Sequence, residues 1–123
     1  MGTPCTILAK TSDGLVKSIT VNYDGHPQSA GKTLKTQYLE QSKIDALMNL
    51  GDLSALYESP ECPEGHSYET PVKGHCIAYG RDRQEEDVEF QVHESIADAK
   101  YYAMELDNEF TYLWDGVEWK MVR

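Results

Sequence analysis

The sequence predicts an α+β fold, in which an antiparallel sheet of about five to six strands packs against two to three helices. Hairpins are indicated near both ends of the chain by the Asp-Gly pairs at 13–14 and 115–116, dipeptides that favour tight turns. Between them, apolar residues at helical spacing alternate with short β-branched runs. At 123 residues the chain fits one domain over 1–123 and is too short for a TIM barrel.

Two strands are predicted first, over residues 6–10 and 15–23. In the second strand, one face carries Leu15, Lys17, Ile19, Val21 and Tyr23. The other face is more polar, so the alternation predicts a half-buried strand with one side in water.

A helix is expected next, from residue 29 to about residue 40. Ser29 can be its N-cap, because a serine hydroxyl accepts a hydrogen bond from a free backbone N–H of the first turn. Its apolar stripe consists of Ala30, Leu34 and Tyr38.

A second, shorter helix is predicted after it. Ser42 and Asp45 have the spacing of a capping box, and Gly51 fits the position that ends a helix. Asp52 can then cap a further helical turn over residues 53–57. Residues 58–74 follow as a loop rich in Pro and Gly, which is long for one domain and therefore either functional or mobile.

The C-terminal part is predicted to hold one more helix and the remaining strands. Ser95 can cap this helix, which runs to about residue 106. The Asp-Gly pair at 115–116 predicts a turn of type I′. Strands are expected over residues 76–79, 88–92, 110–114 and 117–122.

Acidic residues are concentrated in one part of the sequence. The net charge is −10, yet the first 50 residues carry 5 Lys and Arg against 4 Asp and Glu, and the remainder carries 6 against 17. This balance disfavours direct binding to nucleic-acid phosphates or to an anionic membrane. It leaves open a basic protein partner, or a nucleotide held in a local pocket.

Cysteines and targeting signals favour a cytoplasmic protein. Three Cys cannot form a complete disulfide framework. The N-terminus lacks a basic region followed by an apolar run, so no signal peptide is predicted. No apolar stretch approaches the ~20 residues that span a bilayer.

Gly31, Lys32 and Thr33 invite comparison with a phosphate-binding P-loop, because they follow a strand and open a helix. That motif needs a glycine where this chain has His26, and Pro27 removes one of the backbone N–H groups that would face phosphate. We therefore interpret Gly31 as a packing position.

Neither a metal site nor a catalytic set is predicted, and no cofactor is expected. The candidate zinc ligands have an unusual spacing, and the adjacent pair at 75 and 76 points to opposite sides of a strand. The acidic run over 85–89 is typical of a solvated surface. The zinc ligands considered are Cys62, His66, His75 and Cys76.

Polar and aromatic residues follow two predicted strands and form the best candidate site. Arginine can pair bidentately with phosphate, tyrosine can stack on a base, and Asp24 can accept a hydrogen bond from a ribose hydroxyl or an exocyclic amine. The alternative is that Asp24 only forms a turn and that both arginines are tied to neighbouring acids. The residues concerned are Tyr23, Asp24, His26, Tyr79, Arg81, Asp82 and Arg83.

Several short motifs occur together along nearly the whole chain. They are NYDGHP at 22–27, GKTL at 31–34, LGDLSAL at 50–56, HSYE at 66–69, AYGRDR at 78–83 and the closing hairpin at 112–119. Together they resemble a family of short, largely uncharacterised proteins encoded by tailed bacteriophages and prophages. Asn22, Tyr23 and His26 depart from that family, which tends to have His, Trp and Tyr there. The HSYE loop adds His66 to the predicted ligand-binding residues.

The resemblance implies a phage accessory protein without bringing an activity. We therefore predict a non-enzymatic counter-defence protein in the host cytoplasm, which sequesters a nucleotide-derived immune signal in a pocket of a homo-oligomer. The first alternative is an acidic inhibitor of a host nucleic-acid-binding or defence protein, acting through its C-terminal surface. The second alternative is a small nucleotide hydrolase.

Overall fold

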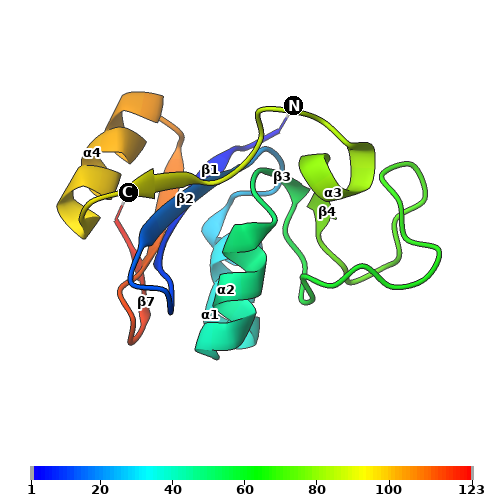
Figure 1. The fold of residues 1–123 in the computed structure, drawn as a ribbon, viewed down its shortest axis with the longest axis horizontal. Helices are drawn as coiled ribbons and strands as arrows, with labels where there is room; N and C mark the ends of the chain where they lie inside the picture. Colours follow the sequence, from blue (N-terminus) through cyan, green and yellow to red (C-terminus); the bar gives the residue numbers. More distant parts are fainter. Residues whose placement is uncertain (1, 123) are drawn as a thin grey trace.

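The computed structural model describes residues 2–122 and arranges them around one mixed sheet (Figure 1). The sheet has seven strands in the order β4-β3-β2-β1-β6-β7, and β5 pairs with β2 outside this path. The predicted α+β class is confirmed. The elements are β1 (Cys5–Lys10), β2 (Val16–Val21), the π-helical turn η1 (Pro27–Gly31), α1 (Lys32–Gln37), α2 (Gln41–Asn49), β3 (Leu53–Ala55), β4 (Ile77–Ala78), α3 (Tyr79–Arg83), β5 (Gln91–His93), α4 (Ile96–Leu106), β6 (Phe110–Trp114) and β7 (Trp119–Met121).

Two crossover connections make the sheet mixed. The hairpin pairs β1–β2 and β6–β7 are antiparallel as expected, but β1 pairs with β6 in parallel and β2 with β3 in parallel. Parallel strands need a connection that returns across a face of the sheet, usually through a helix. Here η1, α1 and α2 lie between β2 and β3, and α4 lies between β5 and β6.

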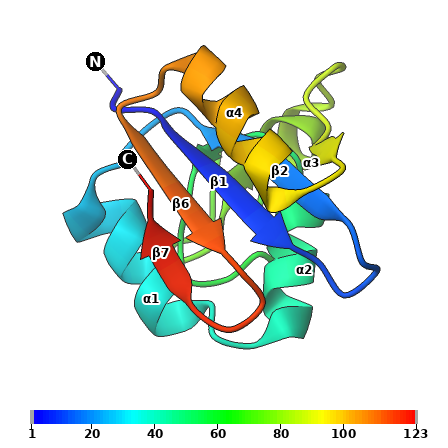
Figure 2. The same cartoon turned by 90° about the vertical axis from the view of Figure 1, so that its left-hand side faces the viewer.

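The two crossovers cover opposite faces of the sheet, as Figures 1 and 2 show. The larger core lies on the side of α1 and α2, and a smaller cluster lies under α4. The larger core includes Ile7, Ile19, Val21, Leu34, Tyr38, Ile44 and Leu47, and the smaller one consists of Leu8, Val16, Ala99, Ala103 and Leu113.

The predicted solvated face of the second strand is wrong. Val16 and Ser18 on that face are only 5% and 2% exposed. The reason is α4, whose crossover covers the face that a hairpin alone would leave in water. Lys17, on the opposite face, is also buried, and its ammonium lies 4.2 Å from the centre of the Phe90 ring.

The two serine caps predicted for α1 and α2 are not formed. The first helical segment begins at Pro27, whose fixed φ suits a helix start, and His26 precedes it without a side-chain cap. The next helix begins at Gln41, one residue before Ser42. Asp45 instead accepts hydrogen bonds from the backbone N–H of Ser12 (3.1 Å) and from Gln41 Nε2 (2.9 Å).

The helical turn predicted over 53–57 is wrong, because this segment begins with strand β3. The carboxylate of Asp52, predicted as a helix cap, accepts the backbone N–H of Thr20 at 2.9 Å and holds the chain beside β2. Gly51 ends α2 with φ +77°, as expected. A Cβ there would also collide with the carbonyl oxygen of Val88, so the position requires glycine.

The remaining predictions are partly correct. The strand predicted over 76–79 is shortened to β4 and is followed directly by a short helix, α3, and the strand predicted over 88–92 is observed as β5, which ends one residue later. Ser95 caps α4 by accepting the N–H of Asp98, and both α4 and β6 have the predicted bounds. The last turn is not of type I′, since Gly116 has a positive φ and Asp115 does not. Across residues 2–122, every helix falls short of the length and apolarity that a membrane crossing requires.

Candidate binding site

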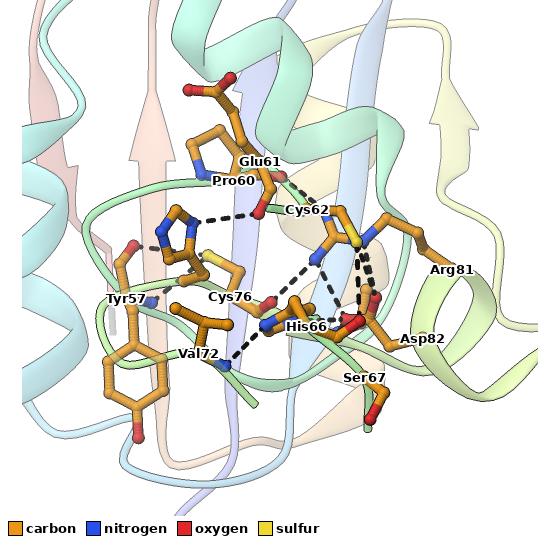
Figure 3. A network of polar contacts seen from close by, with 12 residues as sticks. Tyr57, Pro60, Glu61, Cys62, His66, Ser67, Val72, Cys76, Arg81 and Asp82 are labelled. Atoms are coloured by element: carbon orange, nitrogen blue, oxygen red, sulfur yellow. Dashed lines mark hydrogen bonds and ion pairs between the residues drawn. The ribbon is translucent and has the colours of Figure 1, made fainter. Parts of the chain in front are cut away.

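Asp82 is the centre of a buried polar network between α3 and the loop over 58–74 (Figure 3). Its side chain is 1% exposed, and its Oδ2 accepts hydrogen bonds from the backbone N–H of Ala78 (2.9 Å) and from His66 Nε2 (3.1 Å). Arg81 donates to the same carboxylate through Nε (2.8 Å) and Nη2 (3.0 Å). Burial raises the pKa of the Asp82 carboxyl, but the hydrogen bonds from Arg81, Ala78 and His66 outweigh it and leave the pKa below its usual value.

Arg81 also ties two distant backbone segments together. Its Nη1 donates to the carbonyl oxygen of Pro60 (2.6 Å), and its Nη2 donates to that of Cys76 (2.9 Å). These bonds and the ion pair with Asp82 occupy Nε, Nη1 and Nη2. Arg81 therefore fixes the start and the end of the 58–74 loop, rather than presenting its guanidinium to a ligand.

His66 lies on the buried side of the same loop, and its side chain is 0% exposed. The backbone N–H of Val72 donates to Nδ1 at 2.9 Å, so Nδ1 carries a lone pair. The proton of the neutral ring is thus on Nε2, where it is donated to Asp82. Both nitrogens are used to hold the loop.

Cys62 is near this network without completing a catalytic triad. Its Sγ lies 3.9 Å from the carbonyl oxygen of His66 and 4.0 Å from Asp82 Oδ1. A nucleophilic thiol needs a base within hydrogen-bond reach, and both ring nitrogens of His66 have other partners. Within residues 2–122, no cluster of three or more His, Cys, Asp or Glu has the arrangement of a metal site.

An open polar hollow lies beside the network, between the loop and the C-terminal end of α3. Its volume is about 330 Å³. The lining includes a guanidinium, an aromatic ring, a hydroxyl, an amide and carboxylates, a set that can bind a polar ligand by charge, stacking and hydrogen bonds. The lining residues are Ser67, Tyr68, Glu69, Asp82, Arg83 and Gln84.

Arg83 is the charged anchor of this hollow. Its guanidinium carbon lies 4.6 Å from the centre of the Tyr68 ring and 5.0 Å from that of Tyr79, within the range of cation–π attraction. Nε donates to Glu85 Oε2 at 3.1 Å, and Nη2 bonds to the same oxygen. In the described chain, Nη1 has no hydrogen-bond partner.

The turn after β2 approaches this site through one contact. Asn22 Nδ2 donates to the hydroxyl of Tyr79 at 2.7 Å, which places the beginning of the turn beside α3. Tyr23 is 48% exposed, and Asp24 is exposed with φ +59°. His26 lies elsewhere, with its ring 5.8 Å from that of Phe110 on β6.

Five of the eight predicted site residues thus lie in one neighbourhood, and three of these five hold the loop. His66, Arg81 and Asp82 are engaged with one another, whereas Tyr79 and Arg83 are stacked at the hollow. Sequence reasoning did not single out Tyr68 or Gln84. Tyr68 is in the HSYE motif, but nothing in the sequence indicates that this loop folds back onto Arg83.

Comparisons with protein-family models, with curated proteins and with solved structures found no match. The resemblance to phage proteins therefore stays a prediction from the motifs.

Proposed function

We propose that this chain is a non-enzymatic binding protein that sequesters a nucleotide-derived immune signal in the hollow around Arg83, as a phage-encoded counter-defence protein. The phage origin is inferred from the motif resemblance alone. The ligand class is inferred from one observation, the guanidinium of Arg83 packed against the adjacent rings of Tyr68 and Tyr79, whose centres lie 5.9 Å apart.

Arg83 is suited to hold a phosphate. Its side chain is 47% exposed, and its partner Glu85 is 39% exposed, so their ion pair is screened by water and contributes little to stability. A phosphate carries more charge than a carboxylate and can accept two parallel N–H bonds from one guanidinium. If Glu85 moved away, Nε and Nη2 of Arg83 would be free to donate to a ligand. The unpartnered Nη1 would be a third donor.

Tyr68 and its neighbours provide the rest of a nucleotide site. An aromatic ring at the wall of the hollow can stack on a base of any identity, because every base has a π face. Ser67, Glu69 and Gln84 line the same hollow and offer donors and acceptors for sugar or base edges. The site is preformed, because the latch of Arg81, Asp82 and His66 fixes both walls.

The hydrogen bonds made by the titratable side chains of Asp82 and His66 favour binding over catalysis. The buried carboxylate of Asp82 accepts at least four hydrogen bonds, and both nitrogens of His66 are engaged. General acid–base chemistry needs a group that can exchange a proton with the substrate. A proton exchange at Asp82 or His66 would break the latch that shapes the pocket.

Native mass spectrometry of the purified full chain tests the proposal, because it reports subunit number and any retained small molecule together. Thermal shift with cyclic nucleotides and ADP-ribose-type compounds then gives the ligand class. We expect Arg83→Ala to lose about tenfold or more in affinity, and Arg83→Lys to lose part of it through the missing fork. Lys100→Ala, on α4, is the matched control.

Two outcomes count against the proposal. Undiminished binding by a folded Arg83→Ala protein would show that the ligand does not bind in this pocket. Recovery of a converted product after heat release, instead of the intact compound, would assign the chain to the hydrolases.

A second candidate function is inhibition of a basic host protein through the acidic surface. It is favoured by the exposure of Glu85, Glu86, Asp87 and Glu89, which lie between α3 and β5. Such a contact weakens as salt rises, because counterions screen exposed charges. Capture of a host protein at low salt that persists unchanged at high salt would contradict this candidate.

A further inference from the structure

The sheet ends at β7, and the outer side of this strand is open. β7 pairs with β6 on one side, and no other described strand lies beyond it. Figure 2 shows β7 at the border of the sheet, with α1 beside it. Unpaired strand edges are templates for the addition of another strand.

Two backbone hydrogen bonds at the ends of this hairpin fix which backbone groups of β7 are free. The N–H of Val122 donates to Thr111 O (2.9 Å), and that of Asp115 donates to Glu118 O (3.3 Å). In an antiparallel ladder, the N–H and C=O of alternate residues point to opposite sides. Lys120 lies between Glu118 and Val122 in this alternation, so its backbone N–H and C=O point toward β6. The backbone groups of Trp119 and Met121 face outward.

On the α1 side, this edge borders a groove made of two hollows that share Lys35. Their volumes are about 330 Å³ and 490 Å³. One wall is η1 and α1 with Leu39, and the other is β6 and β7 with the hairpin turn between them. The lining includes Lys32, Lys35 and Met121 in the first hollow, and Lys35, Glu118 and Trp119 in the second.

The groove is basic in an otherwise acidic molecule. Lys32 and Lys35 are exposed, and neither ammonium has an ion-pair or hydrogen-bond partner among residues 2–122. Glu118 is the one acidic residue of the described lining, and it lies at the hairpin turn. Lys120, which by itself would guard an edge strand, is bound to Asp115 at 3.1 Å.

On the α4 side, the same edge borders an apolar hollow of about 170 Å³. Its lining includes Lys100 and two apolar side chains, Val122 and Met104, which are 38% and 65% exposed. The α1 face of the edge thus carries two lysines without partners, whereas the α4 face is mainly apolar with Lys100 at its wall. Successive residues of an added strand alternate between these two faces.

We propose that β7 binds an extended segment of a partner protein in which acidic residues alternate with apolar ones. Its backbone pairs with the outward N–H and C=O groups of Trp119 and Met121. Its carboxylates lie on the α1 face beside Lys32 and Lys35. Its apolar side chains cover Val122 and Met104 on the α4 face.

A second copy of this chain fits the edge less well. Antiparallel pairing of two β7 strands relates the copies by a two-fold axis perpendicular to the sheet, so both α1 helices lie on the same face. The lysines of the two copies would then approach one another. The net charge of −10 on each copy adds a general repulsion.

The test uses the full chain and two synthetic peptides, one alternating Glu with Val and the other alternating Lys with Val. Fluorescence polarisation measures affinity, and amide hydrogen exchange by NMR locates the contact. We expect the Glu-Val peptide to bind at least about tenfold more tightly than the Lys-Val peptide. The amides of Trp119 and Met121 should gain protection, since they face the added strand.

Three variants distinguish the contribution of the β7 backbone to binding from that of the lysine charges. Met121→Pro removes an outward N–H, which an edge strand tolerates, and is expected to abolish binding while the melting temperature stays nearly unchanged. Lys35→Glu is expected to weaken binding about tenfold. Lys73→Glu, in the 58–74 loop, is the matched control and is expected to bind normally. If Met121→Pro unfolds the chain, Lys32→Glu combined with Lys35→Glu decides the question.

Equal affinity for both peptides overturns the proposal, as does binding without protection of the Trp119 and Met121 amides. Protection that grows with protein concentration in the absence of peptide also overturns it, because the occupant is then a second copy. Residues around Arg83 are unchanged in all these variants, so the result is independent of the proposed nucleotide site.

Discussion

The backbone N–H of Val72 donates to Nδ1 of His66 at 2.9 Å, and this bond determines how the 58–74 loop is held. It places the imidazole proton on Nε2, where Asp82 accepts it. One side chain thereby joins two parts of the loop to α3. A loop that contains five Pro and Gly residues at 60, 63, 65, 71 and 74 is ordered by a buried polar latch, rather than by regular secondary structure.

Removal of the His66 side chain should open this loop. His66→Ala leaves the Val72 N–H without its partner and removes one of the hydrogen bonds that Asp82 Oδ2 accepts, a loss of about 1–3 kcal/mol for buried groups. The loop contains one trypsin site, Lys73. Cleavage after Lys73 is therefore expected to be at least about tenfold faster than in the parent chain.

Two further variants identify which bond matters. His66→Asn can keep an acceptor for Val72, and His66→Gln can keep a donor for Asp82. Intermediate cleavage rates are expected for both, and His26→Ala, whose ring contacts Phe110, is the control. An unchanged rate in His66→Ala would show that the latch does not hold the loop.

Acid should weaken the same latch through Asp82. The pKa of this carboxyl is below its usual value, so it stabilises the folded state fully above the unfolded-state pKa of about 3.9. That stabilisation is lost as pH falls through the lower, folded-state value. Denaturant unfolding of the parent chain should thus show falling stability below about pH 4.

Asp82→Asn is the matched variant for this pH effect. Its stability at neutral pH should be lower by about 1–3 kcal/mol, since a charge-assisted network is lost, and its dependence on acid should be shallower. Asp24→Asn, at an exposed left-handed position that asparagine tolerates, should behave like the parent. Parallel pH profiles for Asp82→Asn and the parent would contradict the assignment.

Local patterns predicted the elements whose signals are local. Ser95 was sufficient to predict the start of α4, and the run before the Asp-Gly pair at 115–116 was sufficient for β6. The predictions were wrong where contacts between residues far apart in the sequence determine the structure. Asp52 binds Thr20 instead of capping a helix, and α4 buries the face of β2 that was expected in water.

The same distinction applies to the candidate site. The sequence indicated that Arg81 and Arg83 differ from their acidic surroundings. Because both belong to one motif, however, it could not indicate that they have different roles. The structure assigns Arg81 to the backbone of Pro60 and Cys76, and Arg83 to the surface beside Tyr68. This difference depends on how the loop returns to α3, which no local pattern encodes.

Two of the serines proposed as helix caps should differ in their effect on stability. Ser95 accepts the N–H of Asp98 at 3.1 Å, so Ser95→Ala should lower the free energy of unfolding by about 1 kcal/mol. Ser29 lies inside η1 and caps nothing, so Ser29→Ala should be nearly neutral. Urea unfolding of both variants measures the difference. Equal destabilisation by the two substitutions would contradict the observed helix starts.

The three cysteines should differ sharply in reactivity towards an alkylating reagent. Cys5 and Cys76 are 0% exposed, and burial raises the pKa of both thiols, that of Cys5 to about 12. Cys62 is exposed in the loop. Iodoacetamide at neutral pH should therefore modify Cys62 in the folded chain, and all three residues only in denaturant, as measured by intact mass. Cys62→Ser is the matched control and should take up no label while folded. Rapid labelling of Cys76 in the folded parent chain would mean that the segment joining β3 to α3 opens far more readily than its hydrogen bonds to Tyr38 and Tyr57 indicate.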